Sequence, residues 1–145
     1  MKKFDFLLTR DKTHYLNKMK ELEAEYAKKE RIIGRNYLRG LHIKPQGEEI
    51  FGHYCAISVS VATSGYIVPF RGRFETDEDG TLHFRGSAYP SLLPMIFIVV
   101  FFLLAVLVAK RVDFIIFSLA FLAIQYLFFI KYSKILLRHL EEFFV

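Results

Sequence analysis

Three arginines and a histidine gather in one predicted β-hairpin of this chain. Arg71, Arg73 and Arg85 share a face of the hairpin, together with His83. A guanidinium presents paired N–H donors that match phosphate oxygens. Three interpretations are open. The face is solvated and balanced by Glu75 and the acidic turn, it contacts lipid head groups, or it binds a dedicated phosphate ligand such as a signalling nucleotide.

The turn of this hairpin predicts its register. If residues 77–80 form a type I turn with Gly80 in the left-handed conformation, Glu75 faces His83 and Arg73 faces Arg85. Like charges directly opposite each other on one face are unfavourable unless a counter-charge neutralises them. The predicted pairing of the two arginines therefore calls for a neutralising partner.

No other group of residues indicates catalysis. The histidines lie on different predicted elements without the spacing of a metal site, and we expect His53 in the core, on the side of its strand that carries Cys55. The acidic clusters are typical of solvated faces rather than of paired catalytic carboxylates. The glycines are spaced as turns, not as a phosphate loop. We expect a non-enzymatic protein with no cofactor, no metal and no nucleic-acid polymer as partner.

Two uncharged apolar runs, Leu92 to Ala109 and Phe114 to Ile130, indicate membrane insertion. Each is long enough to cross the hydrocarbon core as a helix, and only four residues separate them. We predict a transmembrane hairpin with spans of about 91–109 and 113–130. Because positive charges concentrate outside the hairpin turn, both termini are expected in the cytoplasm, with the protein multi-pass in the inner membrane.

Polar and small residues within the runs predict how the spans pack. Ser118 and Gln125 lie seven apart, so they share a helix face suited to an interhelical hydrogen bond. Ala105 and Ala109 allow close approach of the two backbones. The soluble part is small, so support from the bilayer or from a second copy, as a homo-oligomer, is expected.

The remaining sequence predicts one helix-plus-sheet domain. Apolar residues at helical spacing from Thr13 to Ile33 predict an amphipathic helix, with Asp11 or Thr13 as its N-cap. Alternating residues then predict four strands, which short turns force into an antiparallel meander. The strands expected are Tyr37 to Ile43, Phe51 to Val61, Tyr66 to Thr76 and Thr81 to Ala88.

The predicted fold class is therefore an α+β membrane protein with four parts. They are an N-terminal helical region 1–36, a cytoplasmic antiparallel β domain 37–88, a transmembrane helical hairpin 89–130, and an amphipathic helical tail 131–145. The tail would lie on the inner leaflet or dock under the domain.

The stretch Gly65 to Tyr89, with Pro69-Phe70-Arg71-Gly72 and Gly80 to Gly86 ahead of the first apolar run, resembles a family of small bacterial membrane proteins. In that family a glycine-punctuated sheet precedes a transmembrane hairpin. The resemblance implies a bacterial membrane protein and carries over no functional residue. The layout is also similar to two-span β-domain effectors of antiphage signalling, in which the spans come before the sheet.

The sequence favours an integral membrane protein whose cytoplasmic β domain binds a protein partner or an anionic ligand. Two alternatives remain open. One is a membrane-perturbing effector triggered by ligand binding, and the other is an accessory membrane subunit of an enzyme or transporter.

Overall fold

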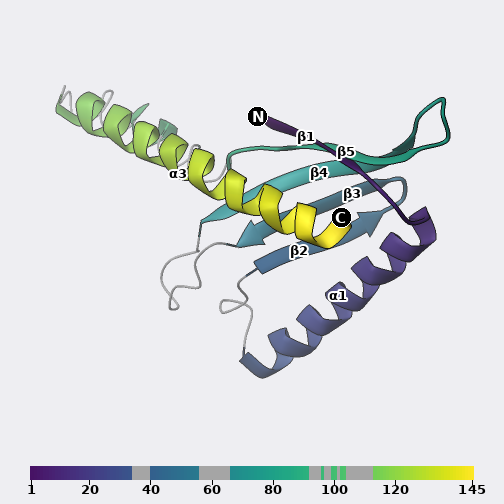
Figure 1. Cartoon of the computed structure of the whole chain (residues 1–145). Helices are drawn as coiled ribbons and strands as arrows, with labels where there is room; N and C mark the ends of the chain where they lie inside the picture. The colour runs from purple at the N-terminus through teal and green to yellow at the C-terminus, as the bar shows by residue number, and fades with distance from the viewer. Residues whose placement is uncertain (34–39, 56–65, 92–95, 97–98, 101, 104–112) are drawn as a thin grey trace.

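The computed structural model describes residues 1–33, 40–55, 66–91, 96, 99–100, 102–103 and 113–145. They form an α+β fold in which two helices accompany a five-stranded antiparallel sheet of order β1-β5-β4-β3-β2 (Figure 1). The elements are β1 (Lys2–Leu7), α1 (Lys12–Ile33), β2 (Gly40–Gln46), β3 (Glu49–Cys55), β4 (Ile67–Thr76), β5 (Leu82–Ala88) and α3 (Asp113–Phe144).

The predicted meander is confirmed for β2 to β5, and so is the register of the last hairpin. Arg73 faces Arg85, and Glu75 faces His83. The backbone N–H of Asp77 donates to the carbonyl of Thr81, and Gly80 has a φ of 77°. The acidic turn and its left-handed glycine set this register, as the sequence predicts.

The prediction of four strands is wrong, because β1 adds a fifth strand at the β5 edge. Phe4 faces Gly86 and Asp5 faces Arg85. Because Gly86 has no side chain, the Phe4 ring can lie directly against the sheet at this position. A Cβ on residue 86 would come within 2.5 Å of the ring. The N-terminal segment is thus part of the sheet and not only a leader to α1.

The predicted break at residues 44–47 is also wrong, because Lys44, Pro45 and Gln46 continue β2. The turn is shorter and follows Gln46, which pairs with Glu49. Pro45 is tolerated because β2 is an edge strand, where a missing N–H costs no ladder hydrogen bond. The predicted residues 37–39 of this strand and 56–61 of the next lie outside the described residues.

Both helices contribute side chains to one core on one face of the sheet. Helix α1 confirms the predicted amphipathic helix, with the Asp11 side chain accepting a hydrogen bond from the His14 N–H. The fully buried core side chains from the sheet and helices include Met19, Ile50, Val68, Phe70, Phe84, Leu136, Leu140 and Phe144. Burial of this apolar surface is the main stabilising contribution to the domain.

The predicted second span and the predicted tail are one helix, α3, and not two elements. Lys131 introduces charge where the apolar run ends, but nothing in the local sequence interrupts helical hydrogen bonding there. From Phe129 onward the helix docks on the sheet with a buried stripe of Phe129, Ser133, Leu136, Leu140 and Phe144. The tail therefore forms core rather than lying on a leaflet.

The first half of α3 extends past the end of the sheet (Figure 1). Its large apolar side chains are exposed, among them Ile116, Phe117, Leu119, Ile124 and Leu127. Within the described residues, one helix segment, Ile116–Phe144, is long and apolar enough to cross a membrane. The predicted hairpin is therefore not shown, and most of its first span, 91–109, lies outside the described residues.

Candidate functional site: the open face of the sheet

The face of the sheet opposite α3, here called the open face, carries the polar and aromatic residues of the strands. Strand alternation places Leu41, Ile43, Ile50 and Val68 toward the core and their neighbours on the open face. Because the strands are antiparallel and in register, open-face residues form rows that cross the sheet.

Three such rows follow one another along the strands. The aromatic row begins beyond β5 with Tyr89, whose N–H donates to the carbonyl of Pro69, and continues through Pro69, His53 and His42. The basic row contains Lys3, Ser87, Arg71, Phe51 and Lys44. The ion-paired row contains Asp5, Arg85, Arg73, Glu49 and Gln46.

The aromatic row includes a stack of rings at the β2 edge. The His42 and His53 rings are parallel within 10°, with their centroids 4.7 Å apart. Tyr26 of α1 stacks on the far side of His42 at 4.1 Å. His53 is thus half-buried on the open face, and its predicted place in the core is wrong because its neighbour Tyr54 is the side chain of β3 that packs against the core there.

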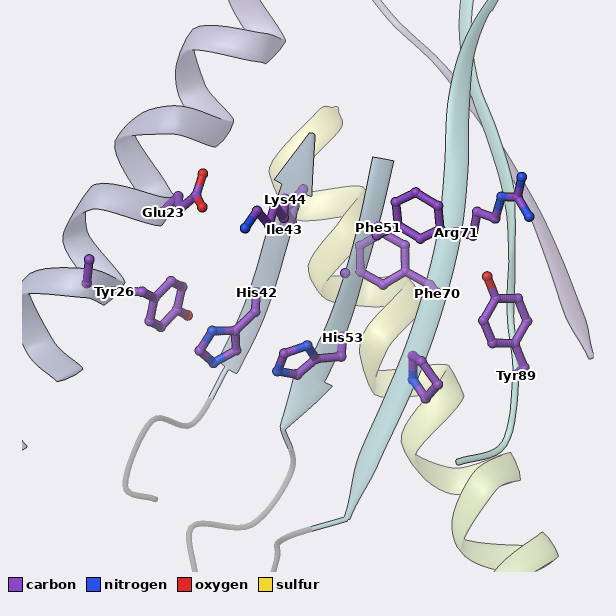
Figure 2. A pocket seen from close by; sticks show the side chains of 13 residues that line it. Glu23, Tyr26, His42, Ile43, Lys44, Phe51, His53, Phe70, Arg71 and Tyr89 are labelled. Atoms are coloured by element: carbon purple, nitrogen blue, oxygen red, sulfur yellow. The ribbon is translucent and has the colours of Figure 1, made fainter. Parts of the chain in front are cut away.

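A groove of about 700 Å³ runs over this stack toward Arg71 (Figure 2). Figure 2 shows α3 behind the sheet and the lining side chains in front of it. Cationic and aromatic groups dominate the lining, which includes Tyr26, His42, Lys44, Phe51, His53 and Tyr89. Glu23 of α1 is the one acidic residue among the described residues that line it. Burial raises the pKa of the Tyr89 phenol, so this side chain enters the groove as a neutral ring.

A second groove of about 480 Å³ lies over the predicted arginine cluster, and Arg71 lines both grooves. Arg73 and Arg85 face each other here, and carboxylates neutralise them. Arg85 Nε donates to Asp5 at 2.8 Å, and its terminal nitrogens contact Asp77 at 2.9 and 3.0 Å. These hydrogen bonds raise the pKa of Arg85 and, in return, lower the pKa of Asp5.

The other two arginines also have acidic partners. Arg73 donates to Glu75, a contact that lowers the pKa of that carboxyl, and Arg71 donates to Glu49, which raises the pKa of Arg71. Four carboxylates, those of Asp5, Glu49, Glu75 and Asp77, thus surround three guanidiniums. Glu75 and the acidic turn supply the balance that the sequence predicts, and β1 adds Asp5.

His83 belongs to the same network. Its Nδ1 lies 2.7 Å from Asp5 and its Nε2 lies 3.3 Å from Asp77, with 14% of the side chain exposed. The structure therefore brings together all four predicted ligand-binding residues, Arg71, Arg73, Arg85 and His83, and a role for them in ligand or lipid binding stays a prediction.

The predicted packing residues lie apart from this face. Ser118 is 4% exposed although it lies in the projecting half of α3. The backbone carbonyl of Gln125 accepts a hydrogen bond from the Tyr66 hydroxyl at 3.1 Å, and burial raises the pKa of that hydroxyl. Ala105 and Ala109 lie outside the described residues.

Sequence reasoning did not identify the groove at the β2 edge. His42 and His53 become neighbours only through the register of β2 with β3. The signal was present in Gly47, whose φ of 67° suits a two-residue hairpin loop. Among the described residues no group of three His, Cys, Asp or Glu side chains is arranged to hold a metal ion.

The open face thus offers an aromatic and cationic groove, a self-neutralised arginine network, and Arg71 between them. Such a face can bind an anionic or amphipathic surface. Comparison of the chain with protein-family models, with curated proteins and with solved structures finds no match.

Proposed function

We propose that this protein is a membrane-anchored, non-enzymatic binding protein. Helix α3 holds its α+β domain at a bilayer, and the open face of the sheet binds a partner or an anionic ligand. The single observation that carries this proposal is the division of α3 into a projecting apolar half and a half that completes the domain core.

The projecting half supports anchoring. Its side chains at positions such as 116, 117 and 119 are 61% to 70% exposed although all are apolar. In water such a surface would drive aggregation, whereas lipid tails accept it. The docked half then ties the anchor rigidly to the sheet, because Leu136 and Leu140 are completely buried.

The one-sided covering of the sheet supports binding. Helix α3 packs on the core face and α1 lies along the β2 edge, where Tyr26 stacks on His42. The described residues therefore leave most of the open face uncovered, including both grooves. Half-buried rings such as Phe51 and Tyr89 are arranged there beside exposed cations. Uncovered aromatic and basic residues in a concave setting are typical of a binding surface.

A photo-cross-linking amino acid placed at Phe51 tests the proposal in cells. An adduct to lipid or protein should form at position 51 and not at two exposed control positions, Lys20 on α1 and Glu141 on α3. The membrane fraction should contain all of the protein. Equal adduct yields at the three positions, or protein in the soluble fraction, would overturn the proposal.

A further inference from the structure

We infer that the sheet stands end-on against the bilayer and that its basic row binds the phosphate groups of anionic phospholipids. Arg71 is the central contact, with Lys44 and Lys3 on either side of it, and the aromatic row lies between them and the hydrocarbon. This inference rests on the proposed function, since it requires α3 to be a membrane anchor.

Helix α3 and strand β4 run side by side, which gives a common scale of depth. Tyr66, directly before β4, contacts α3 at Gln125 and Phe128, and Phe74 at the other end of β4 contacts Phe144. The helix covers about 28 Å between these contacts at its usual rise. The strand covers about 27 Å. The two elements therefore run in the same direction and cover similar distances between the two contacts.

The position of the bilayer edge follows from the charges of α3. The uncharged stretch 114–130 gives about 26 Å of helix, slightly less than the roughly 30 Å hydrocarbon core. All of it is therefore needed to span, and Lys131 marks the edge. Lys131 lies about 9 Å along the helix from Gln125, and Pro69 lies about 10 Å along the strand from Tyr66. The aromatic row is therefore level with the edge, and the end of β4 before it, from Tyr66 to Val68, lies on the hydrocarbon side of the edge.

Successive rows of the open face then fall at increasing distances from the hydrocarbon. The basic row, two residues beyond Pro69, lies about 7 Å farther out, which is within the 5–8 Å or so of a headgroup layer. The ion-paired row lies about 13 Å out, beyond that layer. Depth thus separates Arg71 from Arg73 and Arg85, which the sequence alone groups together.

The chemistry of the rows matches these depths. Rings such as Tyr89 are the side chains that favour a membrane interface. The basic row has three cations, Lys3, Arg71 and Lys44, and no carboxylate of its own, whereas the ion-paired row has Asp5 and Glu49. Arg71 is half exposed, stacks on Phe51 at 5.5 Å, and has one acidic contact, Glu49. A phosphate approaching from the bilayer side reaches Arg71 without displacing Glu49.

Other features place the same end of the sheet at the bilayer. The N-terminus and the ends of β3 and β5 lie at the end from which α3 projects (Figure 1). The sequences that follow β3 and β5, residues 56–65 and 92–109, contain no charged residue. The acidic turn at residues 77–79 lies at the other end, where it avoids repulsion by anionic lipids.

A depth ladder of single tryptophans tests the inference, because the chain contains no natural tryptophan. Tyr89→Trp, Phe51→Trp and Leu7→Trp place one reporter near the edge, one in the basic row and one at the far end of the sheet. The full chain is reconstituted in phosphatidylcholine vesicles with and without phosphatidylglycerol. A headgroup-attached spin label should quench position 89 most, then 51, and leave 7 unquenched.

Adjacent arginines of β4 provide the matched control. In the Phe51→Trp background, phosphatidylglycerol should increase quenching, and Arg71→Glu should abolish that increase while Arg73→Glu retains it. High salt should remove the increase because the attraction is electrostatic. Inorganic phosphate added to phosphatidylcholine vesicles should not reproduce it, and if it did, a soluble phosphate ligand would replace the lipid in this inference.

Equal quenching at positions 89, 51 and 7, or equal responses of the two arginine variants, would overturn the inference. Vesicle flotation of each variant separates this failure from failure of the proposed function. Protein that floats with vesicles but is quenched equally at positions 89, 51 and 7 is still anchored, and only the end-on arrangement of the sheet is then contradicted. Protein that does not float contradicts the anchor itself.

Discussion

The hydroxyl of Tyr15 on α1 donates a hydrogen bond to the backbone carbonyl of Phe144, 3.0 Å away, at the end of α3. Lys18, one turn further along α1, reaches the carbonyl of Phe143 and lies 4.5 Å from the ring centroid of that residue. The last carbonyls of a helix have no partner within it and carry partial negative charge. Helix α1 therefore caps α3 and joins the first and last parts of the chain.

Replacing Tyr15 with phenylalanine removes this cap without changing the size of the core. We expect Tyr15→Phe to lower the free energy of unfolding by about 1 kcal/mol, the usual contribution of one buried hydrogen bond. Thermal unfolding in detergent, followed by circular dichroism, measures it. The same chemical change at the exposed Tyr126 should have no effect. Equal effects of the two variants would show that Tyr15 does not cap α3.

Truncation of Leu140 tests the docked half of α3. This side chain is completely buried, so Leu140→Ala should destabilise the α+β domain by about 2–5 kcal/mol. Lys134→Ala, on the exposed side of the same helix, should change stability little. Limited proteolysis of vesicle-bound protein provides the measurement: the strands should be cut faster in Leu140→Ala, while α3 remains with the vesicles. An unchanged cleavage rate would mean that the tail does not form core.

A methyl group at Gly86 tests the added strand β1. An alanine Cβ there would come within 2.3 Å of the Arg71 carbonyl and 2.5 Å of the Phe4 ring. Gly86→Ala should therefore cost about 1–3 kcal/mol, typical of overpacking, and should release β1. Amide hydrogen exchange of residues 2–7 measures that release. Ser87→Ala, next to it on the open face, is the control, and slow exchange in both variants would contradict the close packing.

The Asp5 network predicts how stability depends on pH. The pKa of the Asp5 carboxyl is lowered in the folded state. Its ion pairs therefore contribute fully to the free energy of unfolding above the unfolded pKa of about 4, and this contribution is lost as the pH falls through the folded pKa. Asp5→Asn should therefore be less stable than the parent at neutral pH and equally stable at strongly acid pH. Thermal unfolding as a function of pH checks this. A stability difference that persists in acid would exclude the ion pair as its source.

Local signals made part of the fold predictable. The acidic turn with Gly80 determined the register of β4 with β5, and the apolar spacing from Tyr15 onward indicated α1. Strand β1 could not be predicted in this way, because six residues that include two lysines and an aspartate become a strand only through pairing with β5.

The remaining errors also concern long-range contacts. Lys131 suggested the end of one element, yet the helix continues because the sheet is an apolar partner for the residues that follow Lys131. The arginine cluster was predicted from one hairpin, but its neutralisation depends on Asp5, which lies in the strand that was missed. The groove at the β2 edge depends on the β2–β3 register in the same way.

The central claim is that α3 is one continuous helix with its first half in lipid and its second half in the domain core. Single cysteines at Leu119, Ile124, Leu127, Lys134 and Arg138, in a Cys55→Ser background, test it directly when vesicle-bound protein is treated with a water-soluble maleimide. The account predicts that positions 119, 124 and 127 react only after detergent is added, and that 134 and 138 react at once. Rapid reaction at all five positions in intact vesicles, or extraction of the protein by alkaline carbonate, would contradict it.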